Sequence, residues 1–107
     1  ANPTTGIEGE ETGPVGEVFL GSPAPNPFSA STAISYSVAG AGRVQIDVFD
    51  MAGRIVDTIF AGDVSEGSHS IAWDGADAGG RPLADGIYMI RLQGGGASST
   101  RTCVLLR

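Results

Sequence analysis

The chain has 107 residues, a formal net charge of −6 and a sequence pI of about 4.4, and its length suits one domain with a tail. This acidity argues against nucleic acids and anionic membrane surfaces as partners. All six basic residues are arginines, so chemistry that needs a lysine amine, such as a Schiff base or an isopeptide cross-link, is excluded.

Cys103 is the only cysteine, so the chain has no internal disulfide. Its place in an apolar segment predicts a small buried side chain rather than a reactive thiol. No apolar run approaches the roughly 20 residues of a membrane span. No basic stretch followed by an apolar one stands at the start. We therefore expect a domain that does not insert into a membrane.

Residues 1–17 form the first segment, which contains glycine, proline, threonine and glutamate and almost no large apolar side chains. A segment of this composition cannot offset the entropy of ordering by burying apolar surface. We interpret it as a flexible acidic linker from a longer precursor in which another domain comes first. Residues 18–107 are then the folded domain.

Short runs of alternating apolar and polar residues follow one another from residue 18 onward. In one run the alternation assigns Val44, Ile46 and Val48 to the core and predicts that Asp47 faces solvent. No helical period occurs, so the sequence predicts an all-β, immunoglobulin-like antiparallel sandwich of about seven strands. The predicted strands are 18–20, 31–38, 43–50, 55–60, 68–73, 87–92 and 100–106.

Two connections between these runs carry strong turn signals. The Pro25-Asn26-Pro27 segment excludes a helix or a central strand and predicts a rigid bend that fixes Phe28 on the core. The three glycines at 94–96 predict a hairpin, which makes the last two strands antiparallel.

A glycine-rich excursion separates Trp73 from the strand that begins at Ile87. Its Asp-Gly and Gly-Gly pairs allow sharp reversals of the backbone. We expect Trp73 and Tyr88 to close one end of the core. Tyr88 also has the setting of the tyrosine corner of immunoglobulin-type sandwiches, in which the hydroxyl bonds back to the preceding corner. Position 90 is isoleucine rather than cysteine, which favours a disulfide-free variant.

Asp74, Asp77 and Asp85 lie in or beside this excursion. With nearby carbonyl groups they offer the oxygen ligands that calcium requires. Their spacing does not match the helix–loop–helix calcium motif, and aspartate is also a common turn residue. Turn formation is the favoured interpretation, with calcium as the alternative and no other cofactor expected.

Catalysis has little support in the sequence. His69 is the only histidine, and it is expected to face solvent on a strand rather than to activate Cys103, because no oxyanion or orienting motif accompanies them. A carboxylate pair for glycoside hydrolysis would need a deep cleft. Carbohydrate binding would need exposed aromatic rings that stack on a sugar. Most aromatic residues occupy positions that the alternation assigns to the core, and Phe49 and Phe60 are the candidates for exposed rings.

Six sequence blocks follow one another along the chain, at residues 25–28, 32–38, 44–54, 67–75, 86–88 and 101–107. In this order they resemble the C-terminal sorting domain of proteins exported by the type IX secretion system. They are also similar to the related Ig-like domain of the flagellar hook-capping protein. The resemblance covers residues 19–107.

The resemblance implies a non-catalytic domain that acts as secretion signal and cell-surface attachment module for a preceding catalytic or adhesive domain. The outer-membrane secretion and attachment machinery would be its partner, and the protein would reach the cell surface or medium through the periplasm and outer membrane. Gly86 and Tyr88 would be recognition residues, together with Arg101 and Arg107 in the last strand. The family commonly has lysines there, and arginine keeps the charge but not the compact ammonium group.

Two other functions remain open from the sequence. One is a structural spacer or a carbohydrate-binding, adhesive module of an extracellular enzyme. The other is a hook-cap-like assembly domain that associates with further copies of itself.

Overall fold

The computed structural model describes residues 16–107 of the chain, so most of the predicted linker, residues 1–15, lies outside the described residues. Every regular element in the described part is a strand, as the sequence predicted, and no helix in it would reach across a bilayer. The strands are β1 (Val18–Leu20), β2 (Thr32–Val38), β3 (Gly42–Phe49), β4 (Ile55–Val64), β5 (Gly67–Trp73), β6 (Gly86–Gly94) and β7 (Ala97–Leu105).

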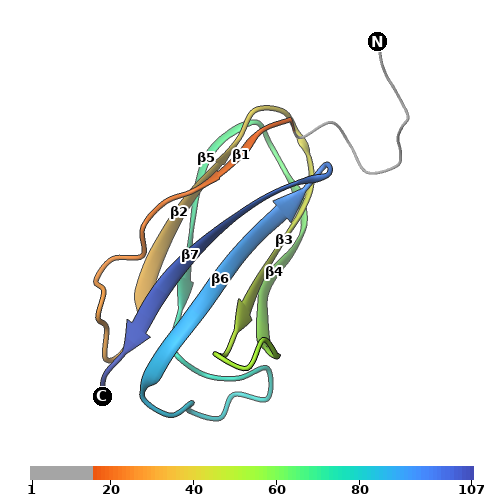
Figure 1. Cartoon of the computed structure of the whole chain (residues 1–107). Helices are drawn as coiled ribbons and strands as arrows, with labels where there is room; N and C mark the ends of the chain where they lie inside the picture. Colours follow the sequence, from red (N-terminus) through yellow and green to blue (C-terminus); the bar gives the residue numbers. More distant parts are fainter. Residues whose placement is uncertain (1–15) are drawn as a thin grey trace.

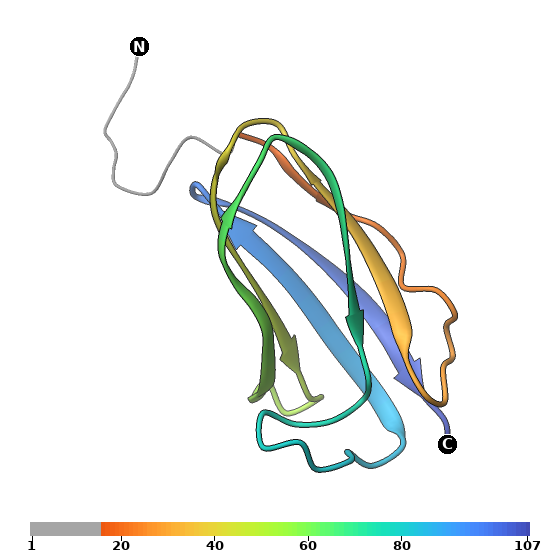
Figure 2. The same cartoon turned by 180° about the vertical axis from the view of Figure 1, so that it is seen from behind.

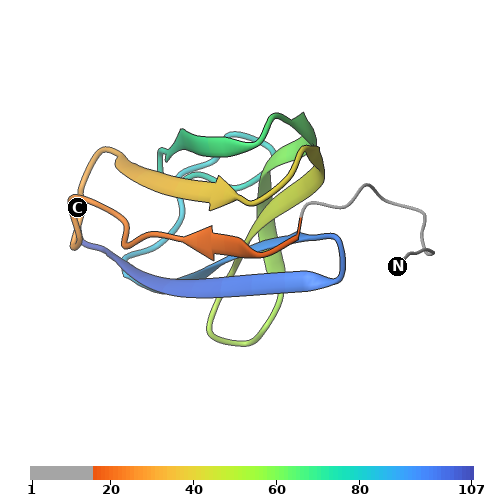
Figure 3. The same ribbon diagram turned by 90° about the horizontal axis from the view of Figure 1, so that it is seen from above.

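The strands form two antiparallel sheets that pack face to face (Figure 1). One sheet has three strands in the order β1-β2-β5, and the other has four in the order β4-β3-β6-β7. Figure 3 shows the two layers from above, with β5, β2 and β1 side by side in one of them. The 74–85 loop crosses one end of the sandwich beyond the β3–β4 turn (Figure 2).

The core lies between the sheets because alternate side chains of each strand point inward. The alternation is clear in β2, where Ile34, Tyr36 and Val38 are buried. It recurs in β3 with Val44, Ile46 and Val48, as predicted. The remaining buried apolar residues are Leu20, Phe28, Trp73, Ala76, Tyr88, Ile90, Leu92, Cys103 and Leu105.

Strand boundaries differ from the prediction mainly in β4, which continues through Gly62 to Val64 instead of ending at Phe60. The β3–β4 ladder explains this extension, since Val44 pairs with Gly62 and Gly42 with Val64. β4 is the edge of its sheet, and pairing with β3 maintains the strand through Gly62 although glycine weakens a strand interior.

Asp47 corrects the prediction of a solvent-facing carboxylate, because its exposed fraction is 0%. The side chain does lie on the outer face of β3, but neighbouring side chains cover it. Gln45 Nε2 donates to both carboxylate oxygens at 3.0 Å, and Thr58 Oγ1 donates to Oδ1 at 2.7 Å. Arg91 lies alongside, with Nη2 3.5 Å from Oδ2. These contacts compensate the loss of water around the charge.

The proline-rich bend closes the edge of the four-stranded sheet along β7. Phe28 is buried, as predicted, and forms a parallel bridge to Leu105. The Asn26 side chain accepts from Val104 N at 2.8 Å and donates to Thr102 O at 3.2 Å. These bonds occupy backbone groups of β7 that would otherwise remain open at the sheet edge.

Candidate functional site

The end of the sandwich where β6 begins is built around Tyr88. Trp73 packs against Phe28 and Tyr88 at centroid distances of 5.6 and 5.5 Å, so the three rings close this end of the core. The Tyr88 hydroxyl donates to Ala84 O at 2.7 Å. This bond confirms the predicted tyrosine corner, and burial raises the pKa of the phenol.

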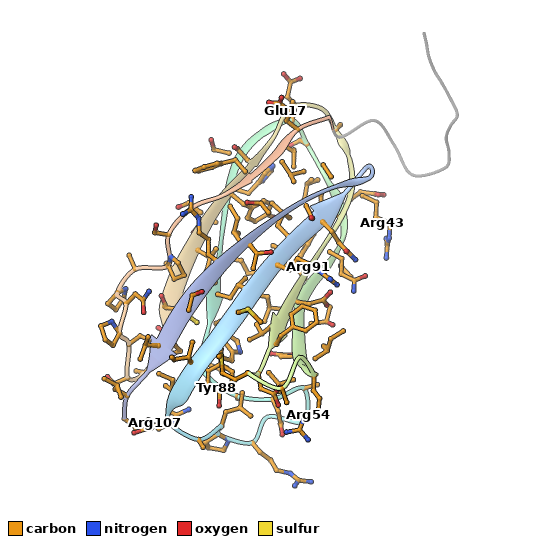
Figure 4. All side chains as sticks on the ribbon, in the orientation of Figure 1. Glu17, Arg43, Arg54, Tyr88, Arg91 and Arg107 are labelled. Atoms are coloured by element: carbon orange, nitrogen blue, oxygen red, sulfur yellow. The ribbon has the colours of Figure 1, made fainter. Side chains whose placement is uncertain are left out.

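Arg107 joins two loops at the same end of the molecule, the 74–85 loop at two points and the β1–β2 connection at one (Figure 4). Its backbone N–H donates to Asp85 Oδ1 at 3.1 Å. Its guanidinium donates to Gly75 O at 2.9 Å and more weakly to Ser29 O at 3.4 Å. The segment after β7 is therefore fastened to the loops at this end.

Gly75 makes room for this contact. Its φ is +74°, and an added Cβ would lie 2.9 Å from Arg107 Nη2 and 3.2 Å from Leu105 Cδ2. Only glycine combines this backbone conformation with such a close approach at low energy. We call the surface formed by Ser29, Gly75, Asp85, Gly86 and Arg107 the loop pole.

Arg101, the fourth residue implied by the resemblance, lies elsewhere. Its Nε donates to Leu20 O at 2.7 Å and its guanidinium lies 5.6 Å from the centroid of the Phe19 ring. It thus connects β7 to β1 of the other sheet. The structure brings Gly86 and Tyr88 near Arg107, since Gly86 pairs with Leu105, but it does not place Arg101 beside them. Tyr88 is buried, so its ring packs beneath the loop pole and supports it without being exposed.

Two of the three candidate calcium ligands accept hydrogen bonds from backbone N–H groups of their own turns, and the third accepts one from the segment after β7. Asp74 accepts from Ala76 N at 3.1 Å. Asp77 accepts from Gly79 N at 2.9 Å and from Arg81 N. Asp85 accepts from Arg107 N. Within residues 16–107 no group of three His, Cys, Asp or Glu residues is gathered for a metal ion. The bonds of Asp74 and Asp77 are of the kind that aspartate makes in turns.

Cys103 and His69 lie in different sheets. Cys103 is fully buried, as predicted, and burial raises the pKa of its thiol to about 11. His69 departs from the prediction of a solvent-facing side chain, because it is half-buried and stacks on Tyr36 at a centroid distance of 5.3 Å. It shares the inward phase with Ile71 and Trp73, and Nε2 lies 2.7 Å from Ser65 O.

Two features near the surface were missed by the sequence analysis. Phe19 is 56% exposed, because a strand of three residues gives too little alternation to identify its inner face. Asp57 is half-buried, and its pKa is raised by burial, to which the charges of Asp74 and Asp77 add. By contrast, Phe49 and Phe60, the candidates for exposed rings, are both half-buried. The Arg91 guanidinium lies over the Phe49 ring, 4.7 Å from its centroid.

A comparison with protein-family models finds the FlgD Ig-like domain over residues 28–98. No curated protein sequence matches the chain.

Among solved structures, two FlgD proteins are similar. FlgD from Xanthomonas campestris, described in connection with hook capping essential for flagellar assembly, shares 29% identity, with a TM-score of 0.59 over 84% of this chain and 70% of that one. FlgD from P. aeruginosa shares 26% identity, with a TM-score of 0.56 over 78% of this chain and 66% of that one.

Two larger proteins from Porphyromonas gingivalis share the fold at lower identity. Dimeric latent PorU matches at 18% identity and a TM-score of 0.62 over 83% of this chain. PorZ, described as an essential bacterial surface component of the type-IX secretion system, matches at 17% and 0.51 over 84% of this chain. The chain spans only 9% and 11% of the PorU and PorZ chains.

Proposed function

Since this chain belongs to the family of FlgD Ig-like domains, we propose that it is a non-catalytic module of a secreted multidomain protein. In this proposal it acts as type IX secretion signal and cell-surface attachment domain. The fold it shares with PorU and with PorZ, the latter a surface component of that system, supports this role. The observation that carries the proposal is the fastening of Arg107 to two loops of the domain, through Gly75, Asp85 and Ser29.

Recognition in this proposal depends on a rigid surface rather than on a flexible tail. Arg107 holds the segment after β7 against Gly75 and Asp85, and the corner bond of Tyr88 fixes the loop before β6. A partner would therefore meet the loop pole in one conformation and would not lose binding energy in ordering it. The proposed partner is the outer-membrane secretion and attachment machinery, which would deliver a preceding domain to the cell surface or medium.

The test is a secretion assay in a host with a functional type IX system. The whole chain is fused to the C-terminus of an inert reporter that is delivered to the periplasm. We expect the reporter in the medium or on the cell surface, and in the periplasm of a host that lacks the system. A fusion that stays in the periplasm of the competent host, although folded, contradicts the sorting role.

Two matched arginine variants test the surface itself. Arg107→Ala removes the contacts with Gly75 and Ser29 and should lower export severalfold. Arg54→Ala removes an exposed arginine paired with Asp50 in the β3–β4 turn and should leave export unchanged. The melting temperatures of both variants are measured, so that a loss of export through unfolding is recognised. Equal export of the two folded variants would argue against the loop pole as the recognition surface.

A second candidate, carbohydrate binding, is favoured by the exposed ring of Phe19 beside the Arg101 guanidinium. Exposed aromatic rings stack on sugars, and the arginine adds hydrogen-bond donors. A pull-down with insoluble polysaccharides, comparing the native chain with Phe19→Ala, separates this function from sorting. Retention that Phe19→Ala abolishes supports it, and no retention excludes it for the polysaccharides used.

A further inference from the structure

β5 is the open edge of the three-stranded sheet. It pairs with β2 over its whole length, from Gly67 to Trp73, without a shift in register. On its other side no backbone hydrogen bond from the described residues reaches it. Figure 3 shows the strand at the border of its layer. Alternate residues of such a strand direct both N–H and C=O away from the sheet, where an added strand can pair with them.

The other outer strands of the sandwich, β1, β4 and β7, are less accessible to an added strand. β1 has only three residues, and its Leu20 N and O already bond to Ser99 Oγ and Arg101 Nε. β7 is covered by the Asn26–Phe28 bend. β4 has two irregularities in its pairing with β3, and Ala78 N already donates to Val56 O. Bulges and covering loops are common means of protecting a sheet edge. β5 has neither a bulge nor a covering loop. Its solvent-facing side chains are small, namely Ser68, Ser70 and Ala72.

Charge determines which kind of strand this edge accepts. The segment 55–80 contains no arginine and the following acidic residues: Asp57, Asp63, Glu66, Asp74 and Asp77. Glu66 and Asp74 stand immediately before and after β5. Near Asp74 a groove of about 450 Å³ separates β4 from β5 and is lined in part by Asp57, Asp74 and Trp73. Burial raises the pKa of Asp57 beside this groove, and the negative charges of Asp74 and Asp77 add to the shift. A cation in the groove would relieve this repulsion between the carboxylates.

The same charges disfavour a second copy of the chain. Antiparallel pairing of two β5 strands about Ser70 would set Glu66 of one copy opposite Asp74 of the other, and parallel pairing would bring identical acids together. Like charges directly opposite each other destabilise strand pairs. A copy of this domain is therefore a poor occupant of the edge.

We propose that β5 accepts an extended segment of a partner protein that carries lysine or arginine at both ends of the added strand. The backbone of the segment pairs with the free side of β5, and its basic side chains lie against Glu66 at one end and against Asp74 and the groove at the other. This inference goes beyond the sorting role and does not depend on it, because it rests on the edge strand and its flanking charges.

The probe is a peptide of about nine residues, the length needed to span β5 and its flanks, with blocked termini. Arginines occupy both ends, and threonine and valine alternate between them. A second peptide has glutamate in place of every arginine. Fluorescence anisotropy at low salt should show binding of the basic peptide about tenfold tighter or more than of the acidic one. Added salt should weaken the binding, because exposed charges are screened.

Two further peptides distinguish strand addition from simple charge attraction. Both keep the arginines. In one peptide the backbone nitrogens of the odd-numbered positions are methylated, and in the other those of the even-numbered positions. An added strand donates to β5 through one phase only, so one methylated peptide should lose binding about tenfold or more while the other retains it. Equal binding of both methylated peptides and the parent would overturn strand addition.

Protein variants locate the contact. Glu66→Gln with Asp74→Asn should weaken binding of the basic peptide severalfold, and Asn at 74 keeps the acceptor for Ala76 N. Glu17→Gln with Asp50→Asn is the control, because it changes the net charge equally at positions outside β5 and its flanks and should have little effect. Hydrogen exchange should show new protection of β5 amides and none in β7.

Three other results would refute the proposal. They are equal affinity for the acidic peptide, new protection confined to another strand, and protection of β5 by concentration-dependent self-association of the free chain. Sedimentation of the chain without peptide detects the last of these.

Discussion

At the scale of single residues, Tyr88 shows how one side chain can both fill the core and determine the path of the loop before it. Its ring packs on Trp73 in the core, while its hydroxyl reaches back to Ala84 O at 2.7 Å. Hydrophobic burial alone would hold the ring without determining the path of the preceding loop. The hydrogen bond couples the two, so that β6 begins at a defined position below Arg107.

Replacing Tyr88 by phenylalanine should lower the free energy of unfolding by about 1 kcal/mol, the net contribution of one hydrogen bond. Urea unfolding followed by tryptophan fluorescence measures it. Tyr36→Phe is the matched control, because the Tyr36 ring is buried and its hydroxyl has no hydrogen-bond partner among residues 16–107. Equal effects of the two substitutions would contradict a special role of the corner.

Cys103 makes stability depend on pH in the alkaline range. Burial raises the pKa of its thiol from 9.0 to about 11, so the folded chain keeps the proton where the unfolded chain loses it. The stabilisation is complete below pH 9 and is lost as pH rises toward 11, by roughly 2–3 kcal/mol. Urea unfolding at stepped pH should show a steeper decline for the native chain than for Cys103→Ala. Parallel profiles would show that the thiol does not contribute.

At the scale of elements, the connections between strands are fixed as firmly as the strands themselves. The bend before β2 is bonded to β7 through Asn26 and Phe28. The 74–85 loop is bonded to the segment after β7 through Gly75 and Asp85. Loops that bond to a distant part of the chain in this way are ordered by the tertiary structure. Residues of these loops make up the loop pole.

Gly75→Ala tests this packing against a control in a similar backbone conformation. Gly53 has a φ of +84° with nothing within 4 Å of an added Cβ, so Gly53→Ala should cost only the backbone strain, about 1 kcal/mol. Gly75→Ala adds a clash with Arg107 and Leu105 and should cost about 1–3 kcal/mol more. Thermal or urea unfolding measures both. Equal losses would mean that the close approach of Arg107 is not maintained in solution.

At the scale of the whole molecule, the core is continuous across the two sheets. Trp73 of the three-stranded sheet packs against Tyr88 of the other, and Arg101 bonds β7 to the backbone of β1. Charge is distributed less evenly, because the 55–80 segment has several acids and no arginine. The result is one cooperative unit with an acidic open edge.

A single unfolding transition is expected from this continuity. Trp73, the only tryptophan, reports on the contact between the sheets, whereas far-UV circular dichroism reports on all strands. The two signals should give coincident urea transitions, which is the mark of two-state unfolding. Separate midpoints would show that one sheet, or the β1 edge, unfolds independently.

The sequence by itself determined the fold class, the existence of every strand and the inward phase of most of them. These follow from local alternation and turn residues, which act over a few positions along the chain. The burial of Phe28, the hairpin before β7 and the corner bond of Tyr88 were predicted for the same reason. The roles of Gly86, Tyr88, Arg101 and Arg107 in recognition stay predictions from the family resemblance.

Only the tertiary structure decided which side chains meet across the sheets and at their edges. Alternation assigned Asp47 to the outer face but did not indicate that Gln45, Thr58 and Arg91 would cover it, because two of these come from other strands. The separation of Arg101 from Arg107 and the open side of β5 likewise depend on strand order. Strand order arises from contacts between residues distant in sequence, and a local pattern of side chains carries no information about them.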